Sequence, residues 1–239
     1  MQATQFEFKF RLWIGFAIYF LGFWAPWVRY SAGAFVVPSA WLELSGELSG
    51  LMPLVTATVV VTLVAILLAA LGTFLRVWGA AYLGSSVVQS QTMQSREVVA
   101  AGPYRYLRNP LYLGSFLFLL AIAILMPVTG AIFAIVAMGL HLTRLVMREE
   151  NFLVTQQGEA YLAYKNLVPC FFPNLPARVT AVTVPTHWRQ ALLAESFQLT
   201  MTICFAALAW RYDAQILIQA LLICFGVSLV IRALAVKPA

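Results

Sequence analysis

The fold is decided by residues 111–147, which read LYLGSFLFLLAIAILMPVTGAIFAIVAMGLHLTRLVM. Two long apolar runs occur here, and only the stretch 126–130, Met-Pro-Val-Thr-Gly, separates them. An apolar run of roughly 20 residues is typical of a helix that crosses a bilayer. A link this short, with a proline and a glycine, predicts a tight turn between antiparallel helices. Residues 111–147 therefore predict a transmembrane helical hairpin.

The composition of the whole chain supports the same class. The chain has 239 residues, of which 62% are hydrophobic and 10% are charged, whereas soluble domains average about 25% charged residues. The net charge of +6 indicates membrane topology and contact with anionic headgroups. No basic stretch is interleaved with aromatic residues, so nucleic acid is not an expected partner. We predict an all-α integral membrane protein.

Six apolar segments are long enough to cross the membrane. They are Leu12–Val28, Pro53–Leu75, Leu111–Met126, Val128–Met147, Trp188–Trp210 and Gln215–Val236. The first is not a cleaved signal, since it contains several aromatic residues and no small-residue cleavage site follows it. We expect one membrane domain over residues 1–239, with residues 188–236 as a C-terminal helix pair.

The loop charges predict the orientation of these six segments. Lys9 and Arg11 place the N-terminus in the cytoplasm, and the arginine-rich segments 76–110 and 148–187 belong on the same side. Residues 29–52 belong outside, although they are apolar enough to lie in the interface or to re-enter the membrane. Both termini are therefore predicted to be cytoplasmic.

The sequence gives no indication of a metal site, a disulfide framework or a transporter repeat. Three cysteines (Cys170, Cys204 and Cys224) and two histidines (His141 and His187) lie far apart, so neither a bound metal nor a disulfide framework is predicted. The chain has no internal repeat, which removes one usual indication of a transporter.

The first polar segment, residues 101–114, precedes and opens the third apolar run. Pro110 suits the first helical position and Asn109 is a preferred N-cap, so a helix should begin there. Its free N–H groups, with Arg105 and Arg108 beside them, favour a carboxylate or phosphate. Alternatively, these arginines only follow the charge rule for cytoplasmic loops, and the tyrosines of this segment form an interfacial belt.

The second polar segment, residues 141–169, follows the hairpin. Glu149 and Glu150 would oppose the helix dipole if the helix ended there, so we expect it to continue to Gly158. Adjacent residues differ in direction by about 100°, so one glutamate can face inward, unless both are simply solvated. Arg144 lies deeper, where an ionisable residue predicts a functional cavity, while His141 can equally be a packing residue.

Taken together, the two segments resemble the isoprenylcysteine carboxyl methyltransferase family, which is similar in turn to the phospholipid N-methyltransferases. The motifs are Gly102-x-Tyr104, Arg108-Asn109-Pro110-x-Tyr112-x-Gly114, Glu149-Glu150, Gly158-Glu159-x-Tyr161-x-x-Tyr164-Lys165 and Val168-Pro169. The resemblance covers residues 102–173, the hairpin 111–147 and the cytoplasmic segment 148–173. It implies an integral membrane methyltransferase that binds S-adenosylmethionine in a cytoplasmic pocket.

The resemblance also implies a set of cofactor contacts. They are Tyr104, Arg108, Asn109, Pro110, Tyr112, Leu113, Glu149, Glu150, Tyr161 and Tyr164. The helix N-terminus and arginine would hold the methionine carboxylate, and a glutamate would hold the ammonium. Leu113 with Tyr161 or Tyr164 would flank the adenine or close the pocket. The family commonly has His where this chain has Asn109, and an amide cannot act as a base.

Methyl transfer from a sulfonium needs mainly in-line positioning and exclusion of water. An amine acceptor must also lose a proton, whereas a carboxylate acceptor need not, and the acceptor is expected to be lipid-like or otherwise hydrophobic. Glu149, Glu150 and Arg144 are the candidate catalytic residues. Two alternatives remain: a membrane NADPH-dependent reductase of the steroid-reductase type, and a transporter or non-catalytic scaffold.

Overall fold

The structure is a computed structural model that describes residues 2–24, 29–31, 34–36, 38–83, 100–211 and 214–235. Its helices and strands are α1 (Gln5–Lys9), α2 (Arg11–Trp24), β1 (Arg29–Ser31), β2 (Ala34–Val36), α3 (Ala40–Leu48), α4 (Leu54–Leu83), the 3-10 helix η1 (Gly102–Arg105), α6 (Pro110–Ala123), α7 (Val128–Gln157), α8 (Glu159–Leu167), α9 (Trp188–Ala194), α10 (Ser196–Arg211) and α11 (Ala214–Ala235).

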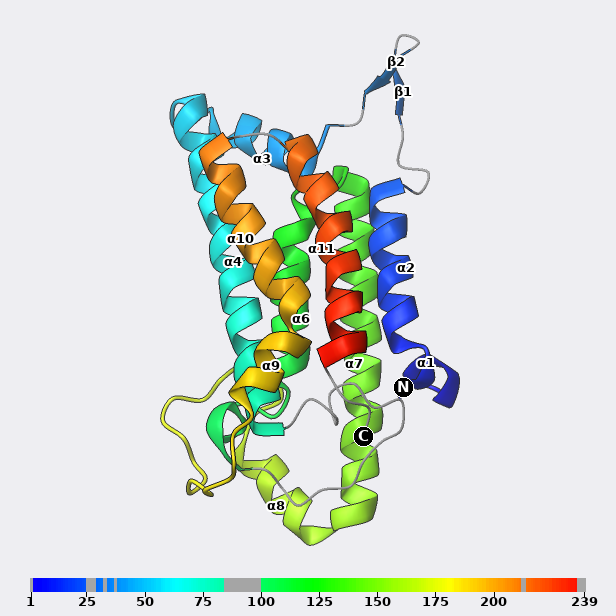
Figure 1. The fold of residues 1–239 in the computed structure, drawn as a ribbon, viewed down its shortest axis with the longest axis vertical. Helices are drawn as coiled ribbons and strands as arrows, with labels where there is room; N and C mark the ends of the chain where they lie inside the picture. The colour runs from blue at the N-terminus through cyan, green and yellow to red at the C-terminus, as the bar shows by residue number, and fades with distance from the viewer. Residues whose placement is uncertain are drawn as a thin grey trace.

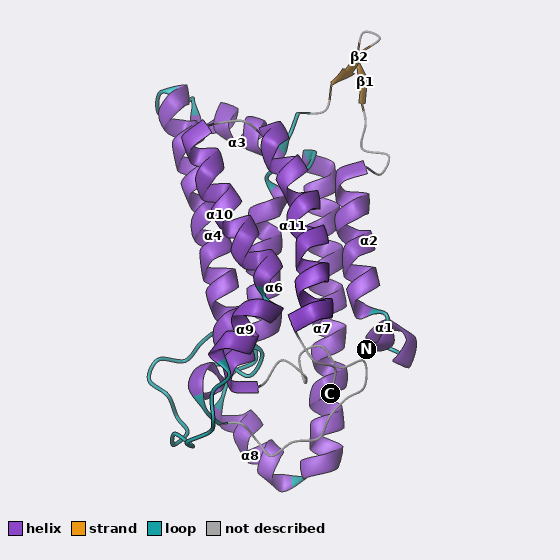
Figure 2. Cartoon of the chain, viewed as in Figure 1, coloured by secondary structure: helices purple, strands orange, loops and turns teal. Residues whose placement is uncertain are grey.

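The long helices α2, α4, α6, α7, α10 and α11 run side by side as a bundle (Figure 1). Helix dominates the chain, as predicted, and the described part also contains a short antiparallel pair, β1 and β2 (Figure 2). By length and composition α4 and α7 qualify to cross a membrane. The other bundle helices contain shorter apolar stretches, so the six-span arrangement stays a prediction.

The predicted helix–turn–helix is confirmed, since α6 ends at Ala123 and α7 begins at Val128, while its crossing of a membrane stays a prediction. The predicted span 53–75 lies within α4, which continues to Leu83. One neighbouring prediction needs correction, because the predicted span 188–210 is divided between α9 and α10 at Glu195. At that break Glu195 is buried and forms an ion pair with Arg76 of α4.

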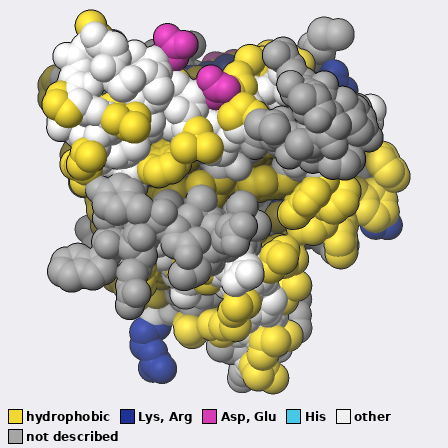
Figure 3. Space-filling view, turned by 90° about the horizontal axis from the view of Figure 1, so that it is seen from above, with side chains coloured by type: hydrophobic (Ala, Val, Ile, Leu, Met, Phe, Trp, Pro, Cys, Tyr) yellow, Lys and Arg dark blue, Asp and Glu magenta, His cyan; other side chains and the backbone are white. Residues whose placement is uncertain are grey.

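The two ends of the bundle differ. Helices α1, α8 and α9 lie at the lower end in Figure 1, and α3 with the β1–β2 pair lies at the upper end. Seen from above, the upper end carries acidic side chains among hydrophobic ones (Figure 3), and Glu43 and Glu47 of α3 are exposed. The described segments that the loop charges predict to share the cytoplasmic side thus lie at one end.

Helix α7 is longer than a bilayer requires. Thirty residues make about 45 Å of helix, against a hydrocarbon core of about 30 Å. If α7 enters the membrane at Val128, its part after Met147 lies beyond the hydrocarbon core. That part carries Glu149 and Glu150 and ends at Gly158, which has a positive φ of 56°, as the sequence predicts for a helix stop.

Helices α4 and α6 pack closely through a pair of glycines. A Cβ atom at Gly114 would lie 2.6 Å from the Gly72 carbonyl oxygen and 2.7 Å from Cγ of Arg76. A Cβ atom at Gly72 would lie 2.6 Å from the Gly114 carbonyl oxygen. No side chain fits at either position, so the backbone of α6 and the stem of Arg76 lie in direct contact.

Candidate active site

Helix α6 begins where the sequence predicts, with Asn109 as N-cap and Pro110 as its first residue. The expected capping bond from the Asn109 side chain is absent, which corrects the prediction. The Asn109 amide instead donates to Glu150 Oε1 at 3.2 Å and to the Cys170 carbonyl at 3.4 Å. The first-turn N–H groups of α6 therefore have no side-chain cap from Asn109.

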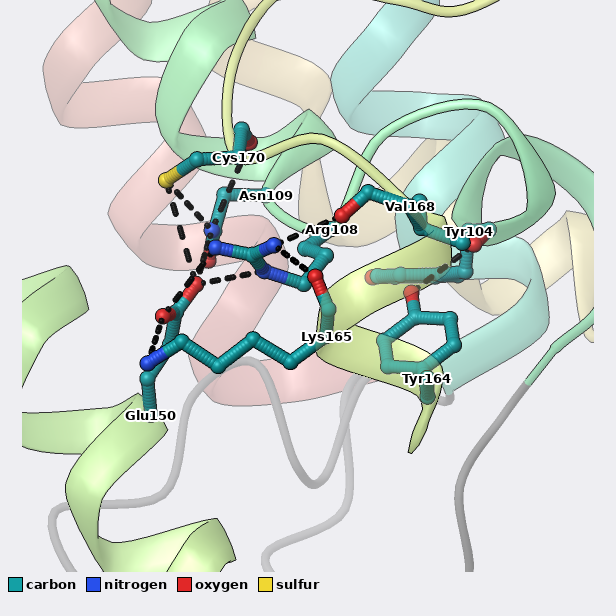
Figure 4. A network of polar contacts seen from close by, with 8 residues as sticks. All are labelled: Tyr104, Arg108, Asn109, Glu150, Tyr164, Lys165, Val168 and Cys170. Atoms are coloured by element: carbon teal, nitrogen blue, oxygen red, sulfur yellow. Dashed lines mark hydrogen bonds and ion pairs between the residues drawn. The ribbon is translucent and has the colours of Figure 1, made fainter. Parts of the chain in front are cut away.

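Arg108 is the centre of the network in Figure 4. Its Nε and Nη2 donate to Oε1 and Oε2 of Glu150 at 2.8 and 3.2 Å. Its Nη1 donates to the carbonyls of Lys165 and Val168 at 2.8 and 2.6 Å. The side chain thus links the residues before α6 with α7, with α8 and with the chain after α8, and four of its five donors are occupied.

Glu150 is the anion of this network and is only 6% exposed. Besides Arg108, it bonds Asn109 and pairs with Lys165 Nζ at 3.1 Å. Burial raises its pKa, but the hydrogen bonds from Arg108 and Lys165 lower it by more, so the net shift is downward. Glu150 is therefore an ionised carboxylate whose charge the protein itself compensates.

Glu149 has different surroundings although it is the adjacent residue. It is half-buried, and one oxygen accepts the Tyr112 hydroxyl at 2.6 Å. No ion pair to Glu149 occurs among the residues that the structure describes. Burial raises its pKa, and the Tyr112 bond and the positive charge of Arg11 oppose this only in part. The two glutamates thus face different partners, as the 100° helical offset predicts, but neither is fully solvated.

The predicted aromatic residues lie beside the network and pack α8 against η1. The Tyr164 hydroxyl donates to the Tyr104 carbonyl at 2.8 Å, and the Tyr161 and Tyr164 rings pack at 5.8 Å. All three side chains are buried, and burial raises their pKa values, so the hydroxyls stay protonated. On α6, Leu113 is half-buried and donates its N–H to the Asn109 carbonyl.

The structure does not bring Arg144 to the Arg108 network. Its Nε and Nη2 bond both oxygens of Glu7 at 3.0 and 2.9 Å. The hydrogen bond from Arg144 also lowers the pKa of Glu7 to about 2. Arg144 and Glu149 are five positions apart on α7, about 140° around the axis, so they face different sides of the helix. The functional cavity expected at Arg144 is therefore replaced by an ion pair with α1.

The face of α7 that carries Arg144 also holds the rest of the N-terminal segment. His141 lies near the Arg11 carbonyl at 3.4 Å, Arg148 donates to the Ala3 carbonyl at 2.9 Å, and Asn151 donates to Gln2. His141 is buried at this contact, which confirms the packing alternative for that residue.

Two residues of the network were not predicted as site residues. Lys165 appears in the family-like motif but its charge was not assigned a partner, and Cys170 was assigned no role. The Cys170 thiol lies 3.4 Å from the Asn109 amide and 3.8 Å from Glu150, and burial raises its pKa, so it stays protonated. The described residues contain no group of three metal-ligating side chains.

Comparisons with known proteins agree with the motifs. A family model described as phospholipid methyltransferase matches residues 60–160, fewer than half of the chain. Neither a search of curated proteins nor a search of solved structures returns a match. The matched segment includes Arg108, Asn109 and both glutamates and stops just before Tyr161. Over residues 60–160 the chain therefore carries the sequence pattern of the phospholipid methyltransferase family, which confirms that part of the resemblance. The likeness to the isoprenylcysteine carboxyl methyltransferases and the motifs after residue 160 stay predictions.

Proposed function

We propose that this chain is an integral membrane methyltransferase that uses S-adenosylmethionine and methylates a lipid-like or other hydrophobic acceptor. The family match supports methyl transfer, and the apolar helices α4 and α7 support a membrane location. The observation that carries the proposal is the contrast between a compensated Glu150 and a Glu149 without an ion pair, next to the start of α6.

The residues fit the ends of the cofactor in the following way. S-adenosylmethionine has an ammonium and a carboxylate on its methionine part. Glu149 is the ligand for the ammonium, because Tyr112 is its one hydrogen-bond donor in the described part. Arg108 is largely occupied, so the uncapped N–H groups at the start of α6 take the carboxylate. Leu113 and Tyr161 remain the proposed neighbours of the adenine.

When bound, S-adenosylmethionine supplies a methyl group already activated by its sulfonium. The residues of the chain then have to orient the two reactants and exclude water. If the acceptor is an amine, it must also lose a proton, and because Glu149 is assigned to the cofactor ammonium, a water chain is the proposed proton acceptor. Glu150 has a lowered pKa and three cationic or amide partners, so its proposed role is to hold Arg108 and Asn109 in place.

The remaining parts of the proposal concern location. The core at 102–173 faces the cytoplasm, both termini lie on that side, and the acceptor enters from the bilayer between the helices. The loop charges support this orientation, and so does the position of α1 and α8 at one end of the bundle (Figure 1).

Thermal shift of the purified protein in detergent tests the function class. We expect S-adenosylmethionine and S-adenosylhomocysteine each to raise the melting temperature, because a ligand that binds only the folded state stabilises it. NADPH should have no effect. A shift with NADPH alone would favour the reductase alternative, and no shift with any of the three would contradict a cofactor site here.

A further inference from the structure

We propose that Arg76 and Glu195 are positioning residues that hold the first turn of α6, and with it the corner formed by residues 108–112, in the geometry the cofactor site needs. Arg76 lies within the residues that the family model matches, 60–160, whereas Glu195 lies outside them. The part of the inference that concerns cofactor affinity rests on the proposed function, whereas the part that concerns corner geometry does not.

The pair is bidentate and buried. Arg76 Nε and Nη2 donate to Glu195 Oε2 and Oε1 at 2.6 and 2.9 Å, and the two side chains are 15% and 1% exposed. Planar, two-bond pairing fixes the direction of the guanidinium as well as its position. Glu195 thus sets where the third nitrogen of Arg76 points.

That third nitrogen reaches α6. Nη1 of Arg76 donates to the Leu111 carbonyl at 3.4 Å and to the Ser115 hydroxyl. Leu111 is the second residue of α6, three positions after Arg108. The corner is therefore held from two sides: Glu150 bonds Arg108 and Asn109, and Arg76 bonds the turn that follows.

The contact between Arg76 and α6 is closely packed. Gly114 lies against the Arg76 stem with no side chain between them. A shift of the guanidinium would therefore displace the first turn of α6, because well-packed contacts transmit small displacements. A shift of that turn changes where Tyr112 and the uncapped N–H groups lie relative to Glu149.

A variant that only weakens the packing of α4 against α10 is the matched control for loss of the Arg76–Glu195 pair. Thr73 Oγ1 and Thr202 Oγ1 lie 2.9 Å apart across the same two helices, and neither side chain has a described bond to α6. Thr202→Val therefore removes a polar contact between α4 and α10 while leaving the contact of Arg76 with α6 intact.

The reactivity of Cys170 reports the corner without any ligand, because its thiol and carbonyl both contact the Asn109 amide. The measurement is the rate of maleimide alkylation of the purified protein in detergent, in a Cys204→Ala/Cys224→Ala background. We expect Arg76→Lys and Glu195→Gln each to accelerate alkylation by about tenfold, the scale of a 1.4 kcal/mol change in a local opening equilibrium. Thr202→Val should stay within about twofold of the parent background, the scale of a change below ~0.5 kcal/mol.

Unchanged Cys170 reactivity in a folded Arg76→Lys variant would overturn the proposal, as would equal acceleration by Thr202→Val. If Glu195→Gln does not fold, the double variant Arg76→Gln/Glu195→Gln, which leaves no uncompensated charge, takes its place with the same expectation. A second measurement, S-adenosylmethionine affinity, should fall in Arg76→Lys and not in Thr202→Val. If the parent protein binds no S-adenosylmethionine, the proposed function fails, and the Cys170 result still decides the positioning role.

Discussion

Arg108 and Glu150 form a two-bond ion pair, with Nε–Oε1 at 2.8 Å and Nη2–Oε2 at 3.2 Å, although 42 positions separate them in the chain. The pair joins the start of α6 to the part of α7 beyond the apolar run. The guanidinium of Arg108 and the buried carboxylate of Glu150 are therefore already bonded to each other. The neighbouring Glu149 forms no ion pair among the described residues, and it is the carboxylate that we propose for a cationic ligand.

The first prediction separates the two glutamates. Glu149→Gln should weaken S-adenosylmethionine binding by about 1.5 to 3 kcal/mol, the range of a hydrogen bond to a charged group. Titration calorimetry in detergent measures it. Glu159→Gln, at an exposed position at the start of α8, is the matched control and should leave the affinity unchanged. Equal affinities in the wild type and Glu149→Gln would remove Glu149 from the site.

A second prediction concerns stability. Arg108→Ala leaves Glu150 buried with Lys165 as its remaining cation, so the free energy of unfolding should fall by about 3 kcal/mol, the range for breaking a buried pair from one side. Denaturant unfolding in detergent measures this. Arg178→Ala, at an exposed position, should change it by less than ~0.5 kcal/mol. A loss that small for Arg108→Ala would show that the pair contributes little to the fold.

The pH dependence of binding gives a third prediction. Because burial raises the pKa of Glu149 above 4.5, protonation of this carboxyl on acidification should begin at a higher pH than for an ordinary glutamate. Cofactor affinity should therefore be full above the raised pKa and fall as the pH drops through it. Glu150, with a lowered pKa, stays ionised in that range. This fall in affinity at low pH should be missing in Glu149→Gln. An identical fall in that variant would assign the pH dependence to another group.

Membrane orientation is the subject of a fourth prediction. In a background without cysteines, Glu47→Cys on α3 should react with an impermeant maleimide applied to intact cells, and Gln156→Cys on α7 should react only after permeabilisation. Both positions are exposed in the structure, so accessibility does not bias the comparison. The reverse pattern, or equal labelling of both sites, would contradict the predicted orientation.

The features that sequence predicts well are those set by neighbouring residues. The hairpin follows from two apolar runs and one short turn, the start of α6 from Asn109-Pro110, and the end of α7 from Gly158. Each of these depends on local conformational preference or on hydrophobic length, and the structure places each where the sequence does.

The partners of the charged residues could not be predicted in the same way. Arg144 is paired with Glu7, 137 positions away, and Arg76 with Glu195, 119 positions away. A sequence shows that an ionisable residue lies in an apolar run and needs a partner, but tertiary packing decides which one it meets. For the same reason the sequence leaves open which of Glu149 and Glu150 faces the cofactor, and the bonds of Glu150 to Arg108 and Lys165 support the proposal of Glu149.

The central claim is that this membrane protein binds S-adenosylmethionine at the start of α6 without a metal. The most direct measurement is calorimetric titration of the purified wild-type protein with S-adenosylmethionine in detergent containing a chelator, with Glu149→Gln titrated in parallel. The account predicts micromolar-scale binding to the wild type, about 8 kcal/mol, unaffected by the chelator and about tenfold or more weaker in Glu149→Gln. Absence of wild-type binding, or binding that the chelator abolishes, would contradict it.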